Sequence, residues 1–215
     1  MLKIKKGARF SSFLFLLTIL SLFLVLYVAF KDFFLSPKEQ FVLAQRADFN
    51  KEYKKAEKYY LLTEKAENSQ LSVLSSYYLG LLYKKKDANL LKHFQKSEAF
   101  LEKAAKKGLA QAQYELALLY DTGDKIEEDH SKAVYWMQKS AEQGFVDAEY
   151  AYAIYIDRGY IEGMGMAQSL IYYERAANKG HQAAIKGLAL IYKLGAEGIE
   201  PNEEKYLFWK NKVLK

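Results

Sequence analysis

The sequence contains no cysteine among its 215 residues, and only 2 prolines and 12 glycines. The lack of cysteine excludes a disulfide scaffold, a thiol nucleophile and every cysteine-ligated zinc or iron–sulfur site. The scarcity of proline and glycine argues against a loop-rich all-β chain. Hydrophobic residues make up 51% of the chain, and 18 tyrosines and 13 phenylalanines make the expected packing aromatic. The composition therefore favours a globular, helical protein with a sizeable core.

Outside the N-terminal segment, basic and acidic residues nearly balance, so the chain has little net charge. The net charge is +6, and Lys3, Lys5, Lys6 and Arg9 all precede the first acidic residue. Without residues 1–30 the net charge falls to +2. A nucleic-acid-binding protein needs a basic stripe on its folded surface, and the remaining sequence shows none. We therefore expect no nucleic-acid partner.

Residues 10–30 form a run without a single charge, proline or glycine. As a helix this run spans about 30 Å, the thickness of the hydrocarbon core of a bilayer. It is longer than the apolar core of a typical signal peptide, and no good small-x-small cleavage site follows it. The sequence therefore predicts an uncleaved transmembrane helix over residues 10–30. A cleaved signal peptide and a soluble core helix are the alternatives.

The basic residues on one side of this run predict its orientation. Four basic residues lie in residues 1–9, whereas Lys31 and Asp32 cancel after the run. Cytoplasmic flanks retain lysine and arginine, so residues 1–9 are expected to be a cytoplasmic tail. The chain would then be a single-pass inner-membrane protein whose C-terminal part lies in the periplasm of a Gram-negative bacterium.

The rest of the sequence repeats itself with a period of 36 residues. Gly108, Gly144 and Gly180 are spaced by this period. Other positions keep the same step, namely Ala112, Ala148 and Ala184, then Leu116, Tyr152 and Leu188, then Ala117, Ala153 and Ala189, and then Trp136, Tyr172 and Phe208. A fixed period of this size indicates an array of stacked structural repeats.

Each repeat has the pattern of two helices. Apolar residues recur at helical spacing over residues 109–121 and again over 131–143, with turn residues between them. Gly144 is expected to end the second helix in a left-handed conformation. One such pair cannot bury both of its faces, so neighbouring pairs must stack.

Residues 109–144 resemble a Sel1-like repeat, which is related to the tetratricopeptide repeat. The matching residues are Ala110, Ala112, Leu116, Ala117 (in place of the usual glycine), Tyr120, Gly123, Asp129, Lys132, Ala133, Trp136, Lys139, Ser140, Ala141 and Gly144. The resemblance implies repeats over about 71–108, 109–144, 145–180 and 181–215, after a linker and capping helix pair over 31–70. The expected fold is all-α: a transmembrane helix followed by an α-solenoid. The resemblance specifies the fold and says little about function.

The sequence contains no recognisable catalytic constellation, and we expect no enzyme activity, cofactor or metal. His130 follows the acidic residues Glu127, Glu128 and Asp129 and could be taken for a metal ligand. No second histidine stands four residues away, and the carboxylates are adjacent rather than spaced for coordination. A solvated loop with a helix-capping aspartate is the simpler interpretation.

With no catalytic motif in the sequence, the candidate functional feature is the surface of the helix pairs. In helix-pair solenoids the first helices line the concave side, where Tyr77, Tyr114, Tyr150 and Lys186 occupy equivalent positions. These residues are the candidate protein-binding residues, because an aromatic ladder suits an extended peptide or a helix. The alternative, which we favour, is that the ladder belongs to the core between repeats.

The functional expectation is a non-enzymatic, membrane-anchored scaffold or adaptor in a bacterial envelope or secretion assembly. Its partners would be proteins, bound through the solenoid surface, and the membrane, bound through residues 10–30. A periplasmic regulator of a membrane sensor kinase and a peptidoglycan-binding or peptidoglycan-modifying envelope protein are the alternatives.

Overall fold

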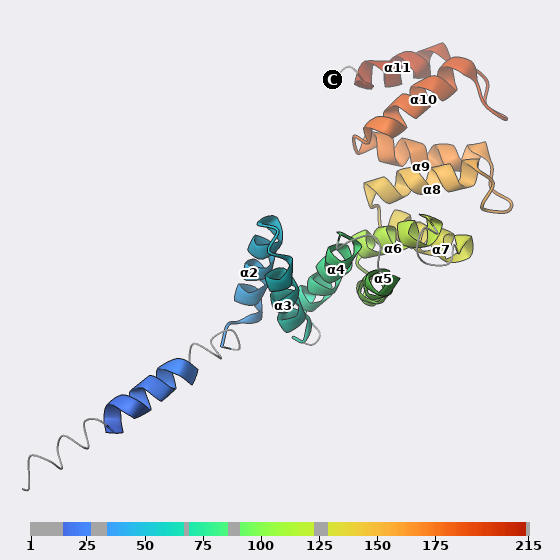
Figure 1. The fold of residues 1–215 in the computed structure, drawn as a ribbon. Helices are drawn as coiled ribbons and strands as arrows, with labels where there is room; N and C mark the ends of the chain where they lie inside the picture. The colour runs from blue at the N-terminus through green and yellow to red at the C-terminus, as the bar shows by residue number, and fades with distance from the viewer. Residues whose placement is uncertain (1–14, 27–33, 67–68, 86–90, 123–128, 214–215) are drawn as a thin grey trace, which may run out of the picture. The chain divides into compact units, whose positions relative to one another are not determined.

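The computed structural model describes residues 15–26, 34–66, 69–85, 91–122 and 129–213 (Figure 1). These residues form two compact units, of which the first extends to Thr63 and the second begins at Glu64. Every regular element within the described ranges is a helix, apart from one isolated β-bridge between Ala196 and Ile199. The all-α class predicted from the composition and the repeat is confirmed.

In the first unit, residues 15–26 are helical and strongly apolar. Large apolar side chains are exposed along this helix, and Phe23, for example, is 68% exposed. Across the described ranges, none of the helices has both the length and the apolar character required to cross a bilayer. The remainder of the expected transmembrane helix, residues 10–14 and 27–30, lies outside the described residues.

The first unit also contains the helix pair α2 (Pro37–Phe49) and α3 (Tyr53–Glu64). Ser36 and Glu39 begin α2 with a capping box, in which the Glu39 amide donates to Ser36 Oγ and the Ser36 amide donates to Glu39 Oε2. Pro37 occupies the first turn, where its missing N–H costs no helical hydrogen bond. The rings of Phe41 and Tyr60, 5.9 Å apart, join the two helices.

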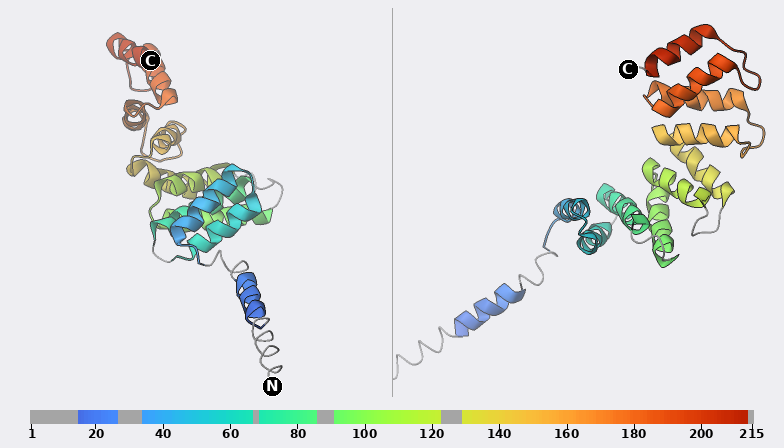
Figure 2. Two further views of the ribbon diagram at one scale, coloured as in Figure 1. Left: turned by 90° about the vertical axis from the view of Figure 1, so that its left-hand side faces the viewer. Right: turned by 45° about the horizontal axis from the view of Figure 1, so that its top comes forward.

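The second unit is a series of helix pairs in which each pair stacks on the next (Figures 1 and 2). The pairs are α4 (Gln70–Lys85) with α5 (Leu91–Lys106), α6 (Ala110–Thr122) with α7 (His130–Glu142), α8 (Val146–Asp157) with α9 (Met166–Asn178), and α10 (Gln182–Leu194) with α11 (Glu203–Val213). The second helix of each pair contacts the first helix of the next. The predicted α-solenoid is therefore confirmed.

The helix ends follow from the repeat. The helices expected over residues 109–121 and 131–143 are found at Ala110–Thr122 and His130–Glu142. Gly108, Gly144 and Gly180 have φ values of +90°, +80° and +92°, which glycine adopts without the steric cost of a Cβ. Each repeat glycine therefore ends one pair and redirects the chain into the next.

Small residues let the paired helices approach closely. Ala112, Ala148 and Ala184 have no exposed surface. In the first pair, a Cβ built on Gly80 would lie 2.6 Å from Leu101 Cγ, so α4 and α5 are closer there than any side chain would allow. The core is thus set by an alternation of small residues with tyrosine, leucine and methionine.

Candidate protein-binding surface

The four candidate protein-binding residues lie on the first helices of the four pairs. Tyr77 is on α4, Tyr114 on α6, Tyr150 on α8 and Lys186 on α10. The three tyrosines are partly buried, whereas Lys186 is exposed. Lys186 therefore differs from the three tyrosines, which we call the tyrosine row, in its exposure to solvent.

Two of the tyrosines, Tyr114 and Tyr150, contact the beginning of the next helix pair. The ring of Tyr114 meets that of Phe145 edge-on, with 5.3 Å between centroids. The ring of Tyr150 stacks on His181 at 4.3 Å. Phe145 and His181 are the N-caps of α8 and α10, so each aromatic contact closes the joint between two pairs. This geometry favours the interpretation of the ladder as packing between repeats.

The surroundings of Tyr77 and Tyr114 raise the pKa of their hydroxyl groups. Burial, reinforced by the nearby charge of Glu115, raises the pKa of Tyr77 to about 12. Burial also raises the pKa of Tyr114, with a smaller effect from Asp147. Glu115 is held by Lys84 across 2.8 Å, which joins α4 to α6 beside the tyrosine row. Tyr77 and Tyr114 therefore offer aromatic edges and neutral hydroxyl groups rather than charge.

Lys186 belongs to a different feature, an open hollow of about 260 Å³ between α10 and α11. We call it the C-terminal groove, and its lining residues are Lys186, Ala189, Leu190, Lys193, Tyr206, Lys210 and Val213. Its floor is apolar and three lysines surround it. Among them, Lys186 is the one candidate protein-binding residue. The others could have been found by comparing each position with its counterpart 36 residues earlier.

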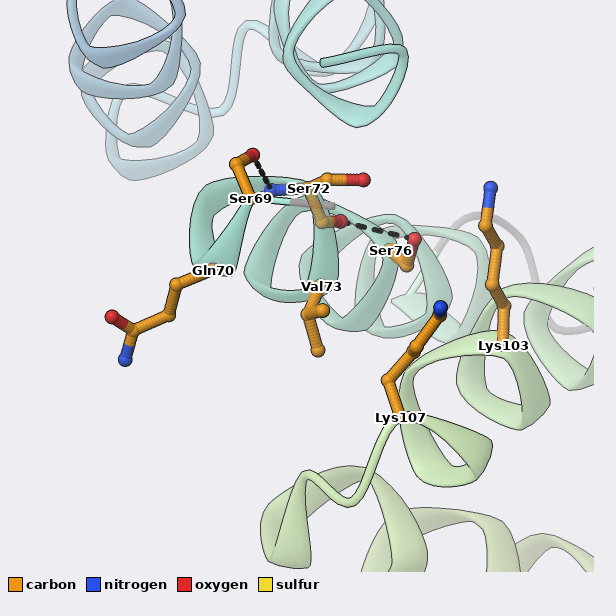
Figure 3. A pocket seen from close by; sticks show the side chains of 7 residues that line it. All are labelled: Ser69, Gln70, Ser72, Val73, Ser76, Lys103 and Lys107. Carbon is orange, nitrogen blue, oxygen red and sulfur yellow. Dashed lines mark hydrogen bonds between the residues drawn. The ribbon is translucent and has the colours of Figure 1, made fainter. Parts of the chain in front are cut away.

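A second hollow, of about 180 Å³, lies between the start of α4 and the end of α5 (Figure 3). Its hydroxyl groups are engaged locally, since Ser72 Oγ donates to the Glu64 carbonyl and Ser76 Oγ to the Ser72 carbonyl. Lys103 at its edge is paired with the Glu64 carboxylate. Ser72, Ser76 and Lys103 are therefore already engaged by other groups of the protein.

The structure also contains a buried charge that the sequence analysis missed. Glu149 on α8 has no exposed side-chain surface, yet it pairs with Arg175 at 2.7 Å and with Lys179 at 2.9 Å. Lys179 also donates to the Gly144 carbonyl at 2.9 Å, and Arg175 to that of Ala141 at 3.2 Å. The cluster ties α9 to α8 and to the end of α7, which is a structural role.

His130 lies near the carboxylate of Asp121 and the ring of Tyr160. Its Nδ1 is 3.8 Å from Asp121 Oδ1, and its ring lies 4.9 Å from that of Tyr160. Within the ranges that the structure describes, no group of three or more histidine, cysteine or acidic side chains could hold a metal ion. Glu127 and Glu128 lie outside the described residues.

Two solved structures similar to this chain are repeat proteins from bacteria. The protein c5321, a protective antigen of uropathogenic Escherichia coli with an SLR fold, aligns with 24% identity, a TM-score of 0.70 and 83% of this chain. The chain spans only 38% of the length of c5321. A Sel1 repeat protein from Oxalobacter formigenes aligns with 26% identity, a TM-score of 0.69, 83% of this chain and 72% of its own. Among curated proteins, no significant match is found.

The sequence pattern of the Sel1 repeat matches residues 73–109, 110–145, 146–181 and 182–207. These matches cover more than half of the chain and coincide with the four stacked helix pairs. Sel1 repeats generally mediate protein–protein interactions, and their fold is typically a non-enzymatic scaffold. On this evidence the chain belongs to the Sel1 repeat family.

Proposed function

We propose that this chain is a non-enzymatic, membrane-anchored scaffold that binds a protein partner in a bacterial envelope or secretion assembly. The observation that carries the proposal is the run of four Sel1 helix pairs downstream of an uncharged segment of membrane-spanning length. A repeat array offers a long surface with side chains at regular intervals, which suits the recognition of another protein. Similar bacterial proteins support the bacterial setting.

The proposed anchor is the segment of residues 10–30. Its described part, residues 15–26, is a helix whose exposed side chains include leucine, isoleucine, valine and phenylalanine. Exposing such a row to water is unfavourable by about 25 cal/mol for each Å² of apolar surface, so this helix needs an apolar environment. The basic residues before it support an N-terminus in the cytoplasm and repeats in the periplasm.

The anchor is tested by adding charge to it. Leu20→Arg with Phe23→Arg places two charges in the proposed span and should release the full chain from membranes washed with alkaline carbonate. Leu194→Arg alters another exposed leucine, on α10, and should leave the protein in the membrane fraction. Release of the unaltered chain by the wash would contradict the anchor.

The orientation needs a separate measurement. A reporter active only outside the cytoplasm, fused after Lys215, should be active, and a reporter active only in the cytoplasm should be silent. The opposite pair of results would place the repeats in the cytoplasm.

The partner is tested by photocrosslinking from a defined surface. A photoreactive residue at Lys186, in the C-terminal groove, should give one discrete protein adduct in intact cells. The same residue at Tyr135, which is 52% exposed on α7, serves as the control and should not give that adduct. A sensor kinase in the adduct would favour the regulatory alternative. Peptidoglycan fragments in place of a protein would contradict the scaffold.

A further inference from the structure

The C-terminal groove has a counterpart in the preceding helix pair, and that counterpart is filled. The groove between α8 and α9 receives α10. Tyr150 of α8 stacks on His181 at the start of α10, and Tyr192 near the end of α10 donates a hydrogen bond of 2.9 Å to Glu174 of α9. The preceding pair therefore shows one helix that packs along α9 and whose N-cap contacts α8.

In the C-terminal groove, the apolar floor is uncovered within the described residues. Ile154 of α8 is partly buried and packs in the core that includes α10. Leu190 stands at the equivalent position of α10 and is 57% exposed. Leu194, one helical turn further along, is 67% exposed. Leu190 is thus exposed where its counterpart Ile154 packs in the core, and Leu194 extends the exposed apolar surface of α10 beyond the groove.

The C-terminal groove also differs from its counterpart in charge. At equivalent positions, lysines replace a neutral or acidic residue in three places, so that Lys186, Lys193 and Lys210 stand where Tyr150, Asp157 and Glu174 stand one repeat earlier. Across the described residues, no carboxylate forms an ion pair with any of the three lysines. Lys193 and Lys210 instead lie 5.7 Å and 5.3 Å from the centre of the Tyr206 ring.

We propose that the C-terminal groove binds an amphipathic helix of a partner protein that carries acidic residues at both ends of its apolar face. The helical shape follows from α10 in the preceding groove. The acidic ends follow from the contacts of α10 in the preceding pair. There, His181 contacts Tyr150, the counterpart of Lys186, and Tyr192 contacts Glu174, the counterpart of Lys210. A helix in the C-terminal groove would therefore place its two ends beside Lys186 and Lys210. The inference deepens the proposed scaffold function, because it assigns a class of partner to one surface of the repeats.

The same charges argue against two other occupants. A second copy docked groove to groove would place its three lysines against those of the first copy, which is repulsive. A membrane surface rich in acidic lipids would attract the lysines, but a flat bilayer would not fill a groove between two helices. A helix with acidic ends satisfies both the shape and the charge.

The probe is built from α10 itself. A hydrocarbon-stapled, fluorescent peptide of residues 181–195 carries His181→Asp and Tyr192→Glu, and its matched control carries His181→Asn and Tyr192→Gln. Both peptides have glutamine in place of their own two lysines, and the staple holds a helix that would be marginal at this length. Binding to the full chain in mild detergent is followed by fluorescence polarisation. Because this assay needs no membrane, it can fail or succeed independently of the proposed anchor.

We expect the acidic peptide to bind about tenfold more tightly than the control, and the preference to disappear in the variant Lys186→Glu with Lys210→Glu. Lys54→Glu with Lys65→Glu changes two exposed lysines outside the groove and should keep the preference. Leu190→Asp should weaken both peptides, because it places a charge on the apolar floor. Thermal unfolding of each variant shows whether it remains folded.

Three results would overturn the inference. Equal affinity for the two peptides, or no binding up to about 1 mM, would contradict the proposal that the groove binds a helix with acidic ends. Dimerisation of the full chain that Leu190→Asp abolishes would assign the groove to a second copy. Loss of binding to phosphatidylglycerol-containing vesicles in Lys186→Glu with Lys210→Glu, without any change in peptide affinity, would assign it to the membrane.

Discussion

Lys179 Nζ lies 2.9 Å from both carboxylate oxygens of Glu149, a side chain that is fully buried. Arg175 completes the pairing at 2.7 Å. Both cations are about 40% exposed, so the carboxylate of Glu149 is the group that loses most of its contact with water. The joint between α8 and α9 therefore depends on keeping this one acid compensated.

Removing both cations should destabilise the fold. Arg175→Met with Lys179→Met leaves Glu149 charged and unpaired in the core, which should lower the free energy of unfolding by about 3 kcal/mol. Adding Glu149→Met to that variant should restore most of the loss. Urea unfolding measures the effect, and Lys139→Met, which breaks an exposed pair with Glu142, is the control. An equal loss in the control would contradict the role of burial.

Gly80 should not tolerate a methyl group. In Gly80→Ala the new Cβ would lie 2.6 Å from Leu101 Cγ, so α4 and α5 must separate. We expect a loss of about 1–3 kcal/mol, despite the better helix propensity of alanine. Gly187→Ala is the matched control, because its Cβ would meet nothing within 4 Å. Gly187→Ala should stabilise α10 by up to about 1 kcal/mol in the same measurement.

Gly180 tests the backbone rather than the packing. A Cβ at this position has no neighbour within 4 Å, yet φ is +92°. Gly180→Ala should therefore cost about 1–2 kcal/mol from backbone strain alone. Gly180→Asn should cost less, because asparagine enters the left-handed region more readily. Equal losses in the two variants, measured by thermal unfolding, would show that strain is not the cause.

Alkaline pH should weaken the repeats through Tyr192. Burial and the hydrogen bond to Glu174 raise its pKa from 10.0 to about 12. A raised tyrosine pKa means that the folded state holds the proton longer than the unfolded state does. The resulting stability is fully present below pH 10.0 and is lost as the pH rises toward about 12. Urea midpoints across this range should fall, and Tyr192→Phe should reduce the fall, whereas Tyr135→Phe should not.

The repeat period carried most of the fold prediction. Once Gly108, Gly144 and Gly180 were recognised as equivalent, the helix pairs and their order followed, and the structure places the helix boundaries within one residue of those expected for the pair over 109–144. This worked because each pair contacts its neighbours, so a local pattern specifies the contacts.

The surface could be predicted only in part. The tyrosine row was correctly placed on the first helices, but the contacts of Tyr114 with Phe145 depend on the angle between pairs. Glu149 looks like a surface acid within its own helix, although the equivalent residues Gln113 and Ile185 are also buried. The 36-residue comparison shows Lys193 and Lys210 as departures from the repeat, but that they line one groove with Lys186 depends on how α10 and α11 pack.

The aromatic joints have a consequence for how such a protein changes in evolution. Tyr114 with Phe145 and Tyr150 with His181 are formed by adjacent units alone. A duplicated block of one period would therefore bring its own joint with it and disturb no distant contact. A new pair added after α11 would instead pack against the lysines of α10 and α11, so its first helix would need acidic side chains there. An added repeat would therefore need a changed sequence at that pair but not at the earlier ones.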